Sequence, residues 1–271
     1  MKKFCIVVPI YQKLTPVELL SVKQLIAITK FKYDIYLVHP DNIDDEDIAV
    51  IYDISEDWKN HLFEKCFSDE FFKSTETYSE LLETNNFWQQ FGDYEYVYIY
   101  QTDCWLFRDE FEYWCDRQFD YIGGPIIAVN ANWKNVPVVG NGGFSLRRVS
   151  KFIEMTSDSF LESHKDLLTN KWRKFEDLYF IQECGRYTYI DTPIVAEAVR
   201  FSWDMNPDII YKQVKDMPFG IHAVDKNIPF WKQLIPEFNN KEIIDECYRR
   251  NKMFIDIYYE NSKDINFSNV M

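Results

Sequence analysis

The 271-residue chain carries 44 acidic and 30 basic side chains, so its net charge at pH 7 is −14. Such an acidic surface repels nucleic acid and anionic membranes, which excludes both as main partners. The content of 46% hydrophobic and 18% aromatic residues excludes a disordered chain, and the length allows a large core without disulfide support. A phosphate-bearing ligand would need a local cation here, either a bound divalent metal or a cluster of arginines.

The six cysteines form no C-x-x-C pair, and most lie in apolar runs, as reduced core thiols do. The apolar run in MKKFCIVVPIY is too short for a signal peptide and ends at Pro9, and no segment reaches the length of a transmembrane helix. We therefore expect a protein of the reducing cytoplasm whose association with a membrane is at most peripheral.

The first forty residues are typical of a βαβ unit. The apolar run 4–10 predicts a strand, the pattern after Thr15-Pro16 predicts a helix, and residues 34–38 predict a second strand. Such a crossover makes the two strands parallel and places the loops that follow them at their carboxyl edge. The acidic segment 41–57 then predicts a surface excursion with some helix.

A helix predicted over residues 73–91 leads through Gly92-Asp93 into the strand of YVYIYQTDCWLF, residues 96–107. Asp103 lies at or just past the carboxyl end of that strand, where ligands bind in open α/β sheets. A carboxylate among apolar residues has to be solvated, paired or bound to a metal. The alternative is that Asp103 starts a turn or caps a helix.

The remaining segments continue the alternation of helices and strands. They are a short helix at 109–114, a strand at 120–123, a glycine cluster within 136–146, helices at 147–168 and 176–184, a strand-like segment at 187–194 and a C-terminal helix at 242–258. No internal repeat, low-complexity linker or domain boundary interrupts them. The chain therefore predicts an α/β fold with a mostly parallel central sheet flanked by helices, in one domain over residues 1–271.

Three further segments could carry chemistry. In GNGGFSLR, residues 140–147, three glycines allow close backbone approach to a ligand that Asn141 could contact, although a tight turn between two strands would also explain them. This segment lacks the lysine of a P-loop and the spacing of a dinucleotide fingerprint. Glu176 and Asp177 open a predicted helix and could supply a general base, or they could simply complement the helix dipole. His222, in PFGIHA, is either a hydrogen-bonded core residue or a metal ligand.

Taken in order, FCIVVPIY, YQTDCWLF, GNGGFSLR, EDLYF and the late His222 resemble the motifs of GT-A-type glycosyltransferases. The similarity is greatest to an uncharacterised bacterial family of polysaccharide-cluster glycosyltransferases that share strings such as YQ-x-D, GNGGFSLR and PFG-x-HA. It implies a Rossmann-type GT-A-like domain with a nucleotide-sugar half over about 1–125. An acceptor half and a C-terminal helical extension would follow over about 126–271. One departure is that Gln101-Thr102-Asp103 keeps only the last acid of a D-x-D motif, so a metal would be held by fewer charges.

The resemblance also implies roles for individual residues. The nucleotide and donor are assigned to Pro9, Tyr11, Ser74, Thr75, Tyr78, Gln101, Asp103 and Arg147. The donor and acceptor sugars are assigned to Asn141, Gly142, Gly143 and Trp133, and Trp172 is a second tryptophan that could stack on a sugar. Asp103 and His222 would hold Mn²⁺ or Mg²⁺, and Asp177 or Glu176 would be the base, with a slight preference for Asp177.

The implied reaction moves a sugar from a nucleoside-diphosphate sugar to a glycan or lipid-linked saccharide, at the cytoplasmic face of a membrane in bacterial surface polysaccharide synthesis. Inversion of the anomeric centre would use the carboxylate base. Two alternatives stay open. A nucleotidyltransferase would usually carry a glycine- and lysine-rich loop after the first strand, and residues 11–15 contain no glycine. A non-catalytic carbohydrate-binding or scaffold protein on a decayed transferase fold is the other.

Overall fold

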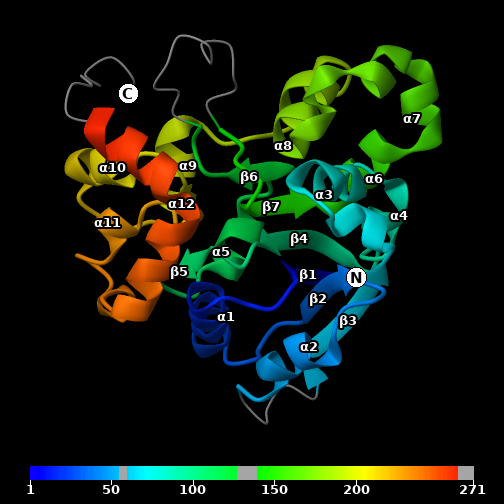
Figure 1. Ribbon diagram of the computed structural model, residues 1–271. Helices are drawn as coiled ribbons and strands as arrows, with labels where there is room; N and C mark the ends of the chain where they lie inside the picture. Colours follow the sequence, from blue (N-terminus) through cyan, green and yellow to red (C-terminus); the bar gives the residue numbers. More distant parts are fainter. Residues whose placement is uncertain (55–59, 127–138, 262–271) are drawn as a thin grey trace.

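A six-stranded sheet in the order β3-β2-β1-β4-β7-β6 forms the centre of the computed structural model, which describes residues 1–54, 60–126 and 139–261 (Figure 1). Its strands are β1 (Lys2–Pro9), β2 (Ile35–Pro40), β3 (Leu62–Phe67), β4 (Tyr94–Tyr100), β6 (Tyr121–Gly123) and β7 (Phe144–Arg148). β7 runs antiparallel to both of its neighbours, and the other pairings are parallel. The predicted mostly parallel α/β sheet is thus confirmed.

Both faces of the sheet are buried, which explains why its central strands are continuous apolar runs. In β1, Phe4, Ile6 and Val8 enter one hydrophobic cluster and Cys5 and Val7 enter another on the opposite face. Helices α1 (Pro16–Thr29), α2 (Asp45–Tyr52) and α5 (Phe111–Asp116) cover the first face, and α3 (Thr75–Leu82), α4 (Asn85–Gln89) and α6 (Val149–Thr156) cover the second.

A third hydrophobic cluster lies beside the main sheet, where Trp105, Trp203 and Trp231 pack together with Val17 of α1. It contains a small sheet of β5 (Trp105–Leu106), β9 (Gly220–Ile221) and β8 (Ser202–Trp203), with helices α9 (Val195–Phe201), α10 (Pro207–Val214), α11 (Ile228–Trp231) and α12 (Lys241–Asn261). Helix α12 packs on α1 and is kinked at Asn251, where the backbone leaves the helical region (Figure 1).

Three predicted helices differ from the expectation. The helix expected over 73–91 is divided into α3 and α4, because the Thr84 hydroxyl accepts from Phe87 N–H and starts a new helix. The range 147–168, expected to be one helix, starts with the last residues of β7. Helix α6 follows and ends at Ser157, which caps the next helix, α7 (Asp158–Ser163). The predicted helix at 176–184 consists of α8 (Glu176–Leu178) and a π-helical turn (Tyr179–Glu183).

One strand prediction is wrong, and one strand was not predicted. Residues 187–194 form no strand; the Asp191 carbonyl merely accepts from the N–H groups of Asp120 and Tyr121 at the start of β6. Strand β3 lies inside a region where none was expected, because it is an edge strand whose Glu64 and Lys65 interrupt the apolar pattern. Five of the six cysteines are buried and Cys66 is exposed, and all six are free thiols.

None of the helices in the described ranges is both long enough and apolar enough to cross a bilayer.

We expect Gly220→Ala to lower the free energy of unfolding by about 1–3 kcal/mol, because overpacking a filled core costs this much. A Cβ on Gly220 would lie 2.5 Å from Cε1 of Phe144, whose ring is stacked on Phe201 and cannot retreat. Urea denaturation measures the change. Gly185→Ala is the control, since its Cβ would meet nothing closer than 3.8 Å. Equal stabilities of the two variants would contradict the predicted clash.

Candidate active site

A pocket of about 550 Å³ opens at the carboxyl edge of the parallel strands, and it collects residues from all five sequence motifs that resemble those of GT-A-type glycosyltransferases. Thirteen of the candidate residues line it: Pro9, Tyr11, Ser74, Thr75, Tyr78, Gln101, Asp103, Asn141, Gly142, Gly143, Glu176, Asp177 and His222. The volume is in the range of small-molecule sites. The polar and glycine-rich segments that follow the strands therefore meet in one place.

Three candidate residues are not placed in this pocket. Arg147 is fully buried beneath the pocket wall and does not line it, in contrast to its expected role as a donor contact. Trp133 lies outside the described residues. Trp172 is half-buried against Phe175 and the ammonium of Lys171, and it does not line the pocket.

The β4–β7 ladder brings the Q-T-D segment beside the glycine cluster. Tyr100 pairs with Phe144 at the end of the ladder, and Gln101 N–H then donates to the Gly143 carbonyl at 3.0 Å. Asn141 Oδ1 accepts from Gly143 N–H at 3.1 Å, which closes the glycine turn. Gly143 packs directly against His222, so no side chain fits there: a Cβ on Gly143 would lie 2.2 Å from Nε2 of His222.

His222 lies between two carboxylates. Its Nε2 is 3.2 Å from Asp103 Oδ1 and 3.0 Å from Gln101 Oε1, and its Nδ1 is 3.1 Å from Asp204 Oδ1. Burial alone would lower the pKa of His222, but Asp103 and then Asp204 outweigh it and raise that pKa to about 10. Burial raises the pKa of Asp103, yet the charge of His222 holds it well below its usual range. The two carboxylates therefore favour the protonated form of His222.

The divalent cation that the resemblance implies fits this cluster through an amide rather than a second acid. Nε2 of His222, Oδ1 of Asp103 and Oε1 of Gln101 converge, and Asp204 holds Nδ1 as a carboxylate does for many metal-bound histidines. Across the described ranges, no three His, Cys, Asp or Glu side chains form a metal cluster. A bound ion would have to displace the proton of His222, which makes its affinity pH-dependent.

Asp177, which also lines the pocket, is held from two sides. Its Oδ2 accepts from Gly142 N–H at 3.1 Å, and its Oδ1 accepts from Leu178 N–H at 2.7 Å. Burial and then the neighbouring charge of Glu176 raise the pKa of Asp177 to about 7. Glu176 itself pairs with Arg147 at 2.7 Å, so the two acids of the E-D segment have different environments.

Basic groups that the sequence reading did not select complete the pocket. Lys226 and Arg250 line it together with Asn251, and all three lie beyond the last motif. Burial lowers the pKa of Lys226, but Asp103 and other acids outweigh it and keep the ammonium charged. Arg250 Nη1 is 3.4 Å from Glu18 and Asn251 Nδ2 donates to Asp225 at 2.8 Å. In the sequence, only the closeness of Lys226 to His222 indicated that these residues belong to the pocket.

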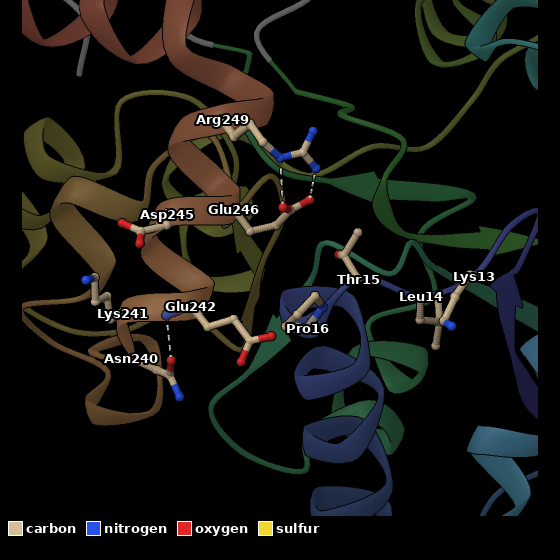
Figure 2. A pocket seen from close by; sticks show the side chains of 10 residues that line it. All are labelled: Lys13, Leu14, Thr15, Pro16, Asn240, Lys241, Glu242, Asp245, Glu246 and Arg249. Atoms are coloured by element: carbon tan, nitrogen blue, oxygen red, sulfur yellow. Dashed lines mark hydrogen bonds and ion pairs between the residues drawn. The ribbon is translucent and has the colours of Figure 1, made fainter.

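A second pocket, of about 960 Å³, lies between the start of α1 and the first turns of α12 (Figure 2). Among its charged side chains, Arg249 is paired with Glu246 at 2.7 Å. None of the candidate site residues lines this open groove, so the two pockets are separate features of the surface.

Residues 62–222, more than half of the chain, match the family model described as "Protein of unknown function (DUF5672)". The chain belongs to the DUF5672 family. The matched range runs from the start of β3 to His222, so it contains the Q-T-D, glycine-cluster and E-D segments. Among curated proteins, none matches the chain.

This DUF5672 protein is similar in fold to solved glycosyltransferase structures. The WbbM bifunctional glycosyltransferase has a TM-score of 0.55 at 10% identity; the match covers 93% of this chain and 52% of WbbM, so the chain spans about half the length of WbbM. Mouse xyloside xylosyltransferase 1 has a TM-score of 0.51 at 9% identity over 82% and 97% of the two chains. An active-site mutant of LgtC has a TM-score of 0.51 at 13% identity over 80% and 86%. At such identities the likeness shows the GT-A fold alone, which confirms the predicted fold class.

We expect Asp177→Asn to become more stable relative to the wild type as the pH rises. Because the pKa of Asp177 is raised to about 7, its contribution to stability is complete below about pH 4 and is lost as the pH rises through 7. The melting temperature of the variant should therefore gain about 2–6 °C on the wild type between pH 5 and 8. Asp158→Asn, at an exposed helix start, serves as the control. A difference that stays constant over this range would mean that the Asp177 carboxyl is not perturbed.

Proposed function

We propose that this protein transfers a sugar from a nucleoside-diphosphate sugar to a hydroxyl group of a glycan or lipid-linked saccharide. The observation that carries the proposal is the single pocket at the carboxyl edge of a GT-A sheet, in which an acidic residue after β4, a glycine turn and a carboxylate with a raised pKa face one space. The acidic residue would hold a cation that neutralises the phosphates, the glycine turn would let the sugar approach closely, and the carboxylate would remove a proton.

The donor diphosphate would bind beside His222, Lys226 and Arg250. A leaving nucleoside diphosphate gains negative charge, and cations already fixed at that point stabilise its departure. The charges of these three side chains are maintained by Asp103, Asp225 and Glu18, which also prevent the cluster from repelling itself. This arrangement supplies the local cations that a phosphate ligand requires on a protein of net charge −14.

A divalent ion, Mn²⁺ or Mg²⁺, would be held by Asp103, the Gln101 amide and His222 in its neutral form, and when bound it would supply positive charge to the leaving group in place of the His222 imidazolium. The remaining oxygen ligands of such an ion normally come from the substrate phosphates and water. Asp204 then orients His222 through Nδ1, at 3.1 Å.

Aromatic side chains suit the nucleotide and sugar ends of the donor. Tyr11, which is 47% exposed at the end of β1, offers a ring face for stacking a base. Tyr78 of α3 turns its hydroxyl into a buried position without a protein partner, so it can donate to or accept from a ligand. Ser74 and Thr75 line the pocket at the start of the same helix.

Asp177 is the proposed base for the acceptor hydroxyl. Two backbone N–H groups fix its carboxylate, and its raised pKa of about 7 makes it a stronger proton acceptor than an ordinary aspartate, with about half of the groups ionised at neutral pH. Glu176 is the weaker candidate, because its Oε1 is occupied by Arg147 and its Oε2 accepts from Ser79. An attack opposite the leaving group, with inversion, follows if Asp177 takes this role.

Asp177→Asn should lower kcat by about 10²- to 10⁴-fold, which is the usual contribution of a positioned general base. Donor binding should stay within a few-fold, because the phosphates are proposed to bind beside His222, Lys226 and Arg250. In the wild type, kcat/KM should rise with pH and level off above about pH 7, as the carboxyl group loses its proton.

The measurement is release of nucleoside diphosphate from a panel of sugar nucleotides with oligosaccharide acceptors, from pH 5 to 9. Asp158→Asn is the matched control, being an exposed aspartate at a helix start. Full turnover by Asp177→Asn would remove Asp177 from the reaction.

UDP, GDP, dTDP or CMP should raise the melting temperature selectively, and Mn²⁺ or Mg²⁺ should enlarge that shift, because a ligand that binds only the folded state stabilises it. Both Asp103→Asn and Lys226→Met should reduce the shift, whereas Lys232→Met, whose ammonium lies over the Tyr248 ring, should leave it unchanged. Thermal denaturation with each nucleotide, with and without EDTA, gives the answer. The absence of a shift with every nucleotide would instead favour a binding or scaffold protein.

A further inference from the structure

A buried ion pair lies directly beneath the wall of the pocket that carries Asp177. Nη2 of Arg147 is 2.7 Å from Oε1 of Glu176, and the Arg147 side chain is 0% exposed. The pair joins β7, which carries Arg147, to α8, which carries Glu176. Removing two charges from water costs several kcal/mol per ion, so this pair is unlike an ordinary surface salt bridge.

Arg147 is held in one orientation by more than its acid. Its Nε donates to Ser145 Oγ at 3.0 Å, and Nη2 also donates to the Gly142 carbonyl at 3.2 Å. The rings of Trp88, Tyr121 and Phe152 surround its guanidinium, with centroids 5.2–5.9 Å away. A guanidinium enclosed in this way cannot swing out to a ligand in the pocket.

The same glycine connects the pair to the candidate base. Gly142 gives its carbonyl to Arg147 and its N–H to Asp177, and a Cβ there would lie 2.5 Å from Glu176 Oε1 and 2.8 Å from Arg147 Nη2. Any shift of the ion pair would therefore move Gly142, and with it the hydrogen bond that orients the Asp177 carboxylate.

We propose that Arg147 and Glu176 are positioning residues, which fix Gly142, orient the Asp177 carboxylate and set the charge next to it without touching a substrate. This proposal rests on the proposed function, because the orientation of a base matters only for catalysis. The contacts between these residues do not depend on that function. It replaces two roles expected from the sequence, a donor contact for Arg147 and a base for Glu176.

The effect of the ion pair on the titration of Asp177 can be measured. Glu176 raises the pKa of Asp177 and Arg147 lowers it, with the acid having the larger effect. Among the other titratable groups, Tyr121 of β6 interacts electrostatically with Asp177, and Tyr78 of α3, Lys174, Asp103 and His222 line the same pocket. Neutralising Glu176 alone leaves the guanidinium beside Asp177, so the carboxyl group should titrate at a lower pH.

The test uses the full chain and needs no sugar donor. The pH dependence of the stability difference between each protein and its Asp177→Asn derivative gives the titration midpoint of Asp177. We expect Glu176→Gln to lower the midpoint by about one pH unit or more, since it removes a like charge and leaves an opposite one. The double variant Arg147→Met/Glu176→Gln should lower it less, because both charges are gone. Glu95→Gln, which breaks the part-buried Arg148–Glu95 pair between β7 and β4, should not move it.

The double variant also distinguishes a positioning role from a structural one. Replacing both members of a buried ion pair often costs little stability, so this variant should remain folded even where Glu176→Gln alone does not. With its Gly142 anchor lost, kcat should fall between about 10- and 100-fold while the KM for the donor stays unchanged, as misplacement of a reacting group does.

The outcomes separate this proposal from the proposed function. An unchanged midpoint in folded Glu176→Gln or in the double variant overturns the positioning pair, whether or not the protein transfers sugar. A lowered midpoint in a protein that releases no nucleotide from any donor supports the pair and removes the proposed function. A lowered midpoint together with a fall in kcat supports both. Loss of donor affinity in place of kcat would return Arg147 to the donor site and overturn the pair.

Discussion

The hydrogen-bond ladder between β4 and β7 holds the two sides of the candidate site together. β7 runs antiparallel to β4, so its first residues meet the last residues of β4, and the ladder ends where Gln101 N–H donates to the Gly143 carbonyl. Because β7 is the one strand of this sheet that runs in the opposite direction, the glycine turn before β7 lies beside the acidic turn after β4. Without it, the acidic turn and the glycine turn would lie at opposite edges of the sheet.

Much of this arrangement could be predicted from the sequence, because it follows from strand ends. Asp103 and the glycine cluster stand next to continuous apolar runs, and such runs become buried strands whose ends lie at an edge. His222 follows another short apolar run, which forms β9. Strand β3 could not be recognised in the same way, since Glu64 and Lys65 are tolerated on an edge strand and conceal the pattern. Helices were predicted too long where a hydroxyl cap, as at Thr84, divides a continuous apolar periodicity.

Other parts of the site depend on packing that no local pattern contains. Lys226 and Arg250 reach the pocket from beyond the last motif, through the third hydrophobic cluster. The position of Arg147 is a more instructive case. Along β7, Phe144 and Leu146 point to one face and Ser145 and Arg147 to the other, as alternation requires. The sequence allows this parity to be deduced, but α6 and α8 bury the second face as well, so the arginine expected to contact the donor is a core residue.

The kinked helix α12 has a consequence for how such a pocket can change. Arg250 contacts Glu18 of α1, Asn251 contacts Asp225, and both line the pocket, yet all four lie outside residues 62–222, the range of the family match. The wall that carries Asp177 and the glycine turn lies inside that range. The pocket is thus modular: one wall belongs to the shared segment and the other to flanking segments of the chain. Mutations in α12 can remodel the ligand-facing wall during divergence without altering the strand ends that carry the acidic and glycine turns.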